Sequence, residues 1–133
     1  MKNEKSHNNT HPSNKEEEKN VEVLRLKQQI AVNVWIQAFG LISEAIALTK
    51  LSFLEEQEPG SQEILKGVWI QVIGQFAEAV GVTLQLLFTD DLSLLRGQRM
   101  ATTGDWLQSI GAAVEAVGGE IAIQSGTPEE LVP

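Results

Sequence analysis

Residues 69–81 read Trp-Ile-Gln-Val-Ile-Gly-Gln-Phe-Ala-Glu-Ala-Val-Gly, and closely similar stretches begin at Trp35 and at Trp106. The three copies share the pattern W-[IL]-Q-x-[FI]-G-x-x-x-E-A-[IV]-[AG], and each copy holds one of the three tryptophans of the protein. The chain is therefore built from one repeated unit, with copies centred on residues 33–47, 67–81 and 104–118. The unit carries packing signals rather than recognisable chemistry, so it indicates architecture more directly than function.

Small residues, mostly glycine, recur every seven positions within each copy. Seven residues are nearly two helical turns, so each series forms one stripe along a helix. Glycine is unfavourable in the middle of a helix, and duplication alone does not explain why a helix would tolerate it. The stripes therefore predict the close approach of a neighbouring helix. Their members are Asn33, Gly40 and Ala47, then Gly67, Gly74 and Gly81, then Gly97, Gly104, Gly111 and Gly118.

Two further stripes accompany the glycines with the same period. A second small stripe consists of Ala38, Ala45, Ala79, Ser109 and Ala116. A large apolar stripe beside the glycines consists of Phe39, Ile46, Phe53, Ile73, Val80, Leu87, Ile110 and Val117. A strand is the competing interpretation for the apolar run over residues 68–73. The clean alternation of a strand is missing there, so we expect a helix.

Polar breaks divide the chain into three long helices, which we expect over residues 16–55, 62–88 and 92–124. Such helices with short connections predict an all-α fold, an antiparallel bundle of three long helices with close packing lined by Gly and Ala. The helical repeat bundle would thus span residues 16–124.

Several local signals mark the ends of these helices. Asn14 is a candidate cap for the first helix, and Ser61 is the expected capping residue of the second after the Pro59-Gly60 turn. Either Asp of the Thr89-Asp90-Asp91 break can cap the third helix. The adjacent pair Gly118-Gly119 predicts a kink or an early end in the third helix, because each glycine costs about 1 kcal/mol relative to Ala.

The two ends of the chain are polar. Residues 1–15 hold nothing to bury after Met1 and predict a disordered tail, and residues 125–133 predict a loose C-terminal tail. His7 and His11 are the only histidines, and their spacing would place them on one helix face as metal ligands. Pro12 disfavours a helix there, so we expect a polar tail and no metal site.

Two polar positions recur in all three copies, a Gln and, seven residues later, a Glu. Three interpretations remain open: a solvated face, a buried or half-buried polar ladder that sets helix register, and a metal or catalytic site made of carboxylates alone. The last lacks the His ligands that di-metal bundles use. The polar register positions are Gln37, Gln71, Gln108, Glu44, Glu78 and Glu115.

Antiparallel pairing of the first two helices about a turn near Glu58 has a consequence for the tryptophans. Trp69 would lie level with Glu44 or Ser43, and Glu78 level with Gln37 or Ile36, because an α-helix rises about 1.5 Å per residue. Each tryptophan would then lie near the Glu of the other copy. A buried indole N–H needs an acceptor, and we expect a carboxylate or Gln oxygen to serve.

Composition excludes several classes of function. The net charge of −8 argues against a nucleic-acid binder and against attraction to anionic lipid. The chain has no Cys, no Ser-His-Asp set and no phosphate loop after a strand. We therefore expect no enzyme, no cofactor and no catalytic residue. Residues 1–20 lack an apolar signal region, so we expect a cytoplasmic protein.

The middles of the helices are apolar nearly all round, which points to a partner. Self-association into a homo-oligomer is the most economical one, because a unit that packs on its own copies can pack on those of another chain. The alternative is a peripheral membrane-associating protein, since a glutamate in every copy disfavours a full membrane span. The expected packing residues are Trp35, Trp69, Trp106, Gly40, Gly74, Gly81, Gly111 and Gly118.

The Trp-Ile-Gln unit with its glycines resembles the uncharacterised small repetitive helical proteins of spore-forming Gram-positive bacteria. The resemblance covers residues 30–120 and rests on the Trp-Ile-Gln and Gly pattern. It implies no activity, substrate or site residue. It does imply a bacterial structural, stress-related or spore-associated role.

Overall fold

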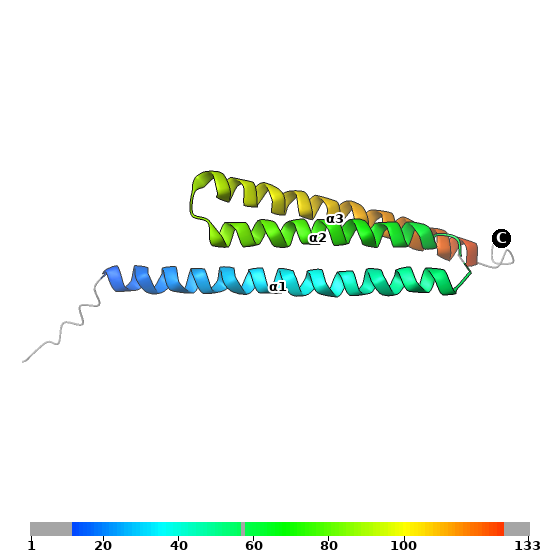
Figure 1. Cartoon of the computed structure of the whole chain (residues 1–133), viewed down its shortest axis with the longest axis horizontal. Coiled ribbons are helices and arrows are strands. Elements are labelled where there is room, and N and C mark those ends of the chain that lie inside the picture. The colour runs from blue at the N-terminus through cyan, green and yellow to red at the C-terminus, as the bar shows by residue number, and fades with distance from the viewer. Residues whose placement is uncertain (1–11, 57, 127–133) are drawn as a thin grey trace, which may run out of the picture.

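The computed structural model describes residues 12–56 and 58–126, which form three long α-helices that run up, down and up (Figure 1). Helix α1 spans Pro12–Leu54, α2 spans Ser61–Leu87 and α3 spans Asp91–Gly126. The predicted all-α bundle of three helices is confirmed. The strand considered over residues 68–73 is excluded, because these residues lie inside α2.

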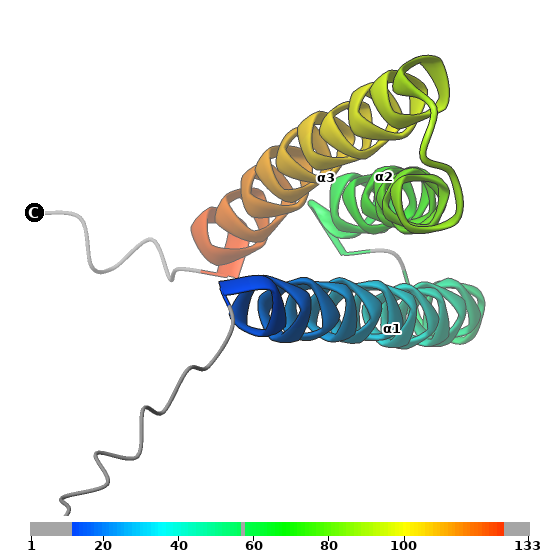
Figure 2. The same cartoon turned by 90° about the vertical axis from the view of Figure 1, so that its left-hand side faces the viewer.

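Helix α2 is the centre of the molecule. It packs against both α1 and α3, whereas no Cα atom of α1 lies within 8 Å of one in α3 over the described residues. Viewed along the helices, α2 and α3 both lie on one side of α1 (Figure 2). The first part of α1 continues past the end of α2 (Figure 1). The three helices therefore form an open layer rather than a closed bundle.

Helix α1 begins at Pro12, four residues before the expected start at residue 16. Proline suits the first turn of a helix, because the N–H group that it lacks has no partner within the helix there. Asn14 consequently lies inside the helix and does not cap it. The rest of the expected N-terminal tail, with His7 and His11, lies outside the described residues, and so do residues 127–133 of the C-terminal tail.

The start of α2 differs from the expected cap. Gly60 precedes the helix with a φ of 87°, a left-handed conformation that glycine adopts without strain. The Ser61 hydroxyl donates to the carbonyl oxygen of Glu58 at 2.8 Å. Ser61 thus fastens the turn between α1 and α2, and Gly60 supplies the change of direction.

The start of α3 confirms the expected aspartate cap. Asp90 accepts a hydrogen bond through Oδ2 from the backbone N–H of Ser93 at 2.9 Å. The expected early end at Gly118-Gly119 is wrong, because α3 continues to Gly126. Gly118 packs against the backbone at Gly60. This contact between helices offsets the low helix propensity of the glycine pair.

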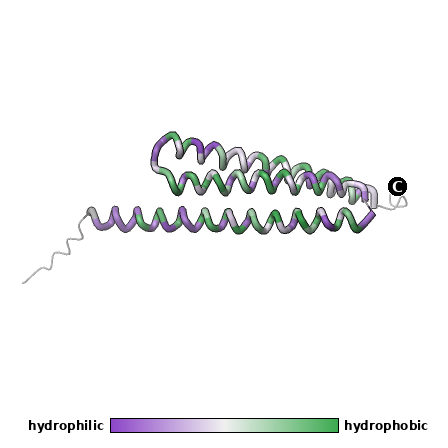
Figure 3. Tube along the Cα trace, in the orientation of Figure 1, coloured by the Kyte–Doolittle hydropathy of each residue, from purple (hydrophilic) through white to green (hydrophobic). Residues whose placement is uncertain are grey.

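Few side chains are buried in this arrangement. Among the described residues, seven apolar side chains are buried, and all seven are Ala or Val. Twenty-four large apolar side chains are exposed, including Phe53 at 83% and Trp106 at 68%. Apolar residues follow α1 and α2 over most of their length (Figure 3). The helices thus bury small side chains between them and leave large ones at the surface.

Replacing Asp90 should lower the stability of α3 by an amount that depends on pH. Hydrogen bonds from the Ser93 side chain and backbone hold the pKa of Asp90 below its ordinary value of 3.8. A lowered folded-state pKa contributes stability above the unfolded value, and this contribution is lost as the pH falls through the folded-state pKa. We expect Asp90→Ala to have a lower Tm than the natural chain at pH 7, and the difference to shrink below pH 3.8.

Asp90→Ser is the matched control, because it keeps a capping oxygen without a titratable carboxyl group. Its Tm relative to Asp90→Ala should not change with pH. Thermal unfolding followed by circular dichroism between pH 7 and about pH 2.5 measures both differences. An Asp90→Ala difference that is constant with pH would contradict the role of the carboxylate.

Candidate helix-packing interfaces

Helices α2 and α3 meet along their glycine stripes, and we name this contact the glycine interface. Each glycine of α2 faces one of α3, and a step of seven residues along one helix matches a step of seven along the other. A Cβ atom built at Gly74 would lie 2.6 Å from the Gly104 carbonyl oxygen. The facing pairs are Gly60 with Gly118, Gly67 with Gly111, Gly74 with Gly104, and Gly81 with Gly97.

No side chain fits at these positions. Real Cβ atoms essentially never come within 3.0 Å of another heavy atom, and the obstructing atoms here are mostly rigid backbone. The two helices therefore approach until their backbones touch. This contact accounts for Gly74, Gly81, Gly111 and Gly118 of the expected packing residues. Gly40 differs, because it lies on the exposed surface of α1 and a Cβ there would meet nothing within 4 Å.

Gln and Glu side chains cross the glycine interface in two layers. Gln71 Nε2 of α2 donates to Glu115 Oε2 of α3 at 2.5 Å, and Gln108 Nε2 of α3 donates to Glu78 Oε2 of α2 at 2.8 Å. The side chains of Gln71, Gln108 and Glu115 also lie against a glycine of the opposite helix, and Glu78 does so through its backbone. All four are half-buried. In these two layers the polar residues therefore pair between helices, as the ladder interpretation describes.

Helices α1 and α2 meet through a different face, which we name the tryptophan interface. Trp35 Nε1 donates to Thr83 Oγ1 at 3.0 Å, and Trp69 Nε1 donates to Thr49 Oγ1 at 3.0 Å. The expected donation to glutamate is therefore wrong. The antiparallel register places each indole opposite a threonine, and Glu78 faces α3 instead.

The two threonines are oriented to accept these bonds. Thr49 Oγ1 donates its own proton to the Ala45 carbonyl oxygen at 2.6 Å, and Thr83 Oγ1 donates to the Ala79 carbonyl oxygen at 2.7 Å. Each hydroxyl thus keeps its lone pairs free for the indole N–H. Both threonines lie fourteen residues after the tryptophan of their own copy. The corresponding residue of the third copy is Glu120.

Alanines of the second small stripe let α1 and α2 approach at the tryptophan interface. Ala38, Ala45 and Ala79 are fully buried there. The Phe76 ring packs edge-on against Trp35, with ring centroids 5.8 Å apart. Ala45, Val68 and Val72 form an apolar cluster in this interface. The tryptophan interface is thus a small apolar core with one indole–hydroxyl bond toward either end.

Gln75 is a buried polar residue that the sequence did not reveal as a site. It is only 3% exposed, and its Nε2 donates to the Val34 carbonyl oxygen of α1 and to Glu78 Oε2, both at 3.3 Å. Gln75 therefore connects the two interfaces. A signal was present, because the corresponding residues of the other copies are Leu41 and Ala112. A polar residue at an otherwise apolar repeat position indicates a specific partner.

The remaining predicted residues lie apart from both interfaces. Gln37 and Glu44 of α1 are exposed, and so is Trp106 of α3. The large apolar stripe is exposed as well on all three helices, including Phe39, Ile73 and Ile110. Helix α2 therefore takes part in both the glycine interface and the tryptophan interface. Helices α1 and α3 each take part in one of them and leave the residues of the other face exposed.

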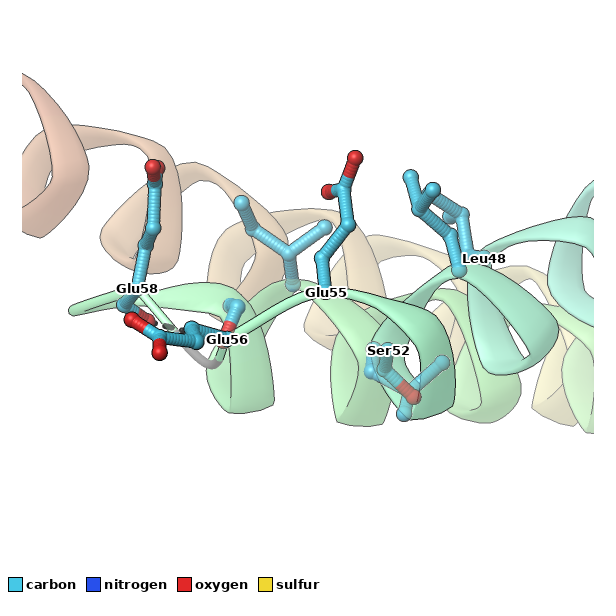
Figure 4. A pocket seen from close by; sticks show the side chains of 9 residues that line it. Leu48, Ser52, Glu55, Glu56 and Glu58 are labelled. Atoms are coloured by element: carbon cyan, nitrogen blue, oxygen red, sulfur yellow. Dashed lines mark hydrogen bonds between the residues drawn. The ribbon is translucent and has the colours of Figure 1, made fainter.

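A shallow pocket of ≈ 200 Å³ lies where the turn joins α1 to α2. Its rim carries Glu55, Glu56 and Glu58, and the carboxylates of Glu55 and Glu58 point away from the helices (Figure 4). No group of three or more potential ligands that could hold a metal ion occurs among residues 12–56 and 58–126. None of the residues that line it occupies a recurring Trp, Gln, Gly or Glu position of the repeat, and we assign it no role.

Comparison with protein-family models, with curated proteins and with solved structures returns no match to this chain. The resemblance to the repetitive proteins of spore-forming bacteria therefore stays a prediction. The helix contacts themselves are the observations from which function is argued.

Replacing a glycine with alanine adds one methyl group, and its effect on the free energy of unfolding should differ between packed and unpacked glycines. Gly118→Ala places a Cβ about 2.6 Å from the Gly60 carbonyl oxygen, so we expect a loss of about 2 kcal/mol or more in the free energy of unfolding. Its neighbour Gly119 has nothing within 4 Å of that position. Gly119→Ala should therefore stabilise the chain by about 0.5–1 kcal/mol through helix propensity.

Urea unfolding followed by circular dichroism measures both variants. Equal effects of Gly118→Ala and Gly119→Ala would contradict the close approach of α2 and α3.

Removing one hydroxyl should weaken the tryptophan interface. Thr83→Val keeps the branched shape but leaves the half-buried Trp35 N–H without its acceptor, so we expect a loss of about 1 kcal/mol in stability. The Trp35 contribution to the fluorescence spectrum should change with it. Thr103→Val on the exposed surface of α3 is the control and should alter neither quantity. A Thr83→Val variant indistinguishable from Thr103→Val would refute the role of this bond.

Proposed function

We propose that this chain is a non-enzymatic helical repeat protein that acts through self-association in a structural or assembly role. The observation that carries the proposal is the imbalance between buried and exposed apolar residues. Seven apolar side chains are buried and 24 large ones are exposed among the described residues. Large contiguous apolar surfaces on a protein mark an interaction site, because water contact with them is unfavourable.

The distribution of contacts supports a partner of the same kind. Helix α2 uses one face for α3 and another for α1, and both contacts are antiparallel and built from repeated residues. Helices α1 and α3 each use one such face inside the chain. In a protein whose repeats pack on their neighbours, a terminal repeat lacks one neighbour and keeps one face exposed. A second copy of the chain carries the residues that can cover this face.

Membrane association is the second candidate, and one observation favours it. Two helices are long and apolar enough to cross a membrane by length and composition, over Asn14–Leu54 and Ser61–Leu87. Only 22% and 28% of their most apolar windows are buried. Against a span, Glu44 and Glu78 lie within these segments, and a charge in lipid is costly. This candidate therefore takes the form of a helical protein on the membrane surface.

The cellular setting belongs to the same proposal. A chain without cysteine and with a net charge of −8 suits a reducing cytoplasm. The resemblance noted for the Trp-Ile-Gln unit supports a bacterial role connected with stress or spores. Association through packed helices requires no cofactor and no catalytic residue.

The mass in solution separates the two candidates. We expect light scattering after size exclusion, without detergent and at two concentrations, to give a dimer or larger, well above the 14.6 kDa of one chain. Tryptophan emission should already be blue-shifted in buffer and should not shift further when liposomes are added. A chain that stays monomeric, and whose emission shifts only when liposomes are added, would refute self-association and support the membrane candidate.

A further inference from the structure

Helix α1 carries an open face that corresponds, position by position, to the glycine interface of α2 and α3. Gln37 and Glu44 occupy the places that Gln71 and Glu78 occupy in α2. We define the open face of α1 by the exposed residues Asn33, Gln37, Gly40, Glu44 and Ala47. Figure 2 shows that α2 and α3 cover only one side of α1.

We propose that this open face pairs with the same face of α1 in a second copy of the chain, in an antiparallel two-fold dimer. The proposal rests on self-association and names its partner surface. The glycine interface within the chain shows what these repeat positions do when two of them meet. There the Gln of each helix donates to the Glu of the other. Two copies of α1 satisfy the same pattern, with Gln37 of each donating to Glu44 of the other.

The polar pair selects one register. When Gln37 faces Glu44 of the second copy, Gly40 faces Asn33 of the second copy. The Asn33 side chain then packs against a glycine, which has no side chain. A register shifted by one repeat would place Gly40 against Gly40 and Glu44 against Glu44. Two facing carboxylates repel, and the two Gln37 side chains would lose their acceptors. Complementary pairing thus disfavours this neighbouring register.

The same register covers apolar residues that the single chain exposes. Ala47 faces Leu26 of the second copy, and Leu51 faces Ile30 of the second copy. Leu26, Ile30 and Leu51 are all exposed in the single chain. The proposed pairing therefore packs the first half of α1 in each copy against the second half of α1 in the other.

Asn33 makes the proposed contact less close than the glycine interface. In α2 the corresponding residue is Gly67, whose Cβ would meet the α3 backbone. Asn33 holds two copies of α1 further apart. The contact is therefore weaker than the one between α2 and α3, and it forms and separates with the chain remaining folded.

Exchange of one polar pair tests the proposal. Gln37→Glu places an introduced carboxylate beside Glu44 of the second copy at two symmetric sites, so we expect the dimer Kd to rise about tenfold or more. The double variant Gln37→Glu/Glu44→Gln restores the pair, with the amide donor now at position 44 and the carboxylate acceptor at position 37. We expect its Kd to be near that of the natural chain. Gln98→Glu adds the same charge on the exposed surface of α3 and should leave the Kd unchanged.

Sedimentation equilibrium measures the three Kd values, and circular dichroism checks that each variant stays helical. A monomeric natural chain in buffer would refute both self-association and this pairing. A stable oligomer whose Kd responds equally to Gln37→Glu and Gln98→Glu would refute the α1 pairing alone. Failure of the double variant to regain affinity would also refute it.

Cross-linking tests the register independently, because the natural chain has no cysteine. A mixture of Gln37→Cys and Glu44→Cys chains should form a disulfide-linked dimer on mild oxidation. Either variant alone should not, because its two thiols are offset by seven residues, about 10 Å along the helix. Equal cross-linking of the single variants and the mixture would overturn the register.

Discussion

Backbone contact between α2 and α3 at their facing glycines is the constraint on which the structure depends. The carbonyl oxygens of Gly67 and Gly74 occupy space that a Cβ on Gly111 or Gly104 would need. The separation of the two helices is thus set by the absence of side chains. It brings Gln71 within hydrogen-bond reach of Glu115. Each glycine lowers the helix propensity, and dispersion contacts along the two long helices offset this loss.

The tryptophan interface follows a different physical rule. Small alanines bring α1 and α2 together, and each indole is held at its polar end by a threonine hydroxyl. Helix α2 takes part in both kinds of contact, and the buried Gln75 bridges them by donating to α1 and to Glu78. Because α1 and α3 each contact only α2 among the described helices, the outer faces of α1 and α3 are the natural places for association.

Much of this architecture was predictable from periodicity. Three helices, their breaks and the aspartate cap followed from residue types whose local preferences are strong. The acceptors of the tryptophans were not predictable, because a shift of five residues along α1 or α2 exchanges glutamate for threonine as the facing residue. Such a shift is decided by side-chain packing across the whole contact. Gln75 was missed for the same reason, since its partner is a backbone carbonyl of another helix.

The sequence by itself determined that the chain is helical, repeated and striped with glycine, since these properties depend on local preference and on a period of seven. Only the tertiary structure decided which stripes meet. Gly74 and Gly40 hold the same place in the repeat, yet one touches a backbone and the other faces open space. The reason is physical: α2 lies between two helices and α1 lies at the edge, and a residue's role depends on the neighbour that its place in the layer supplies.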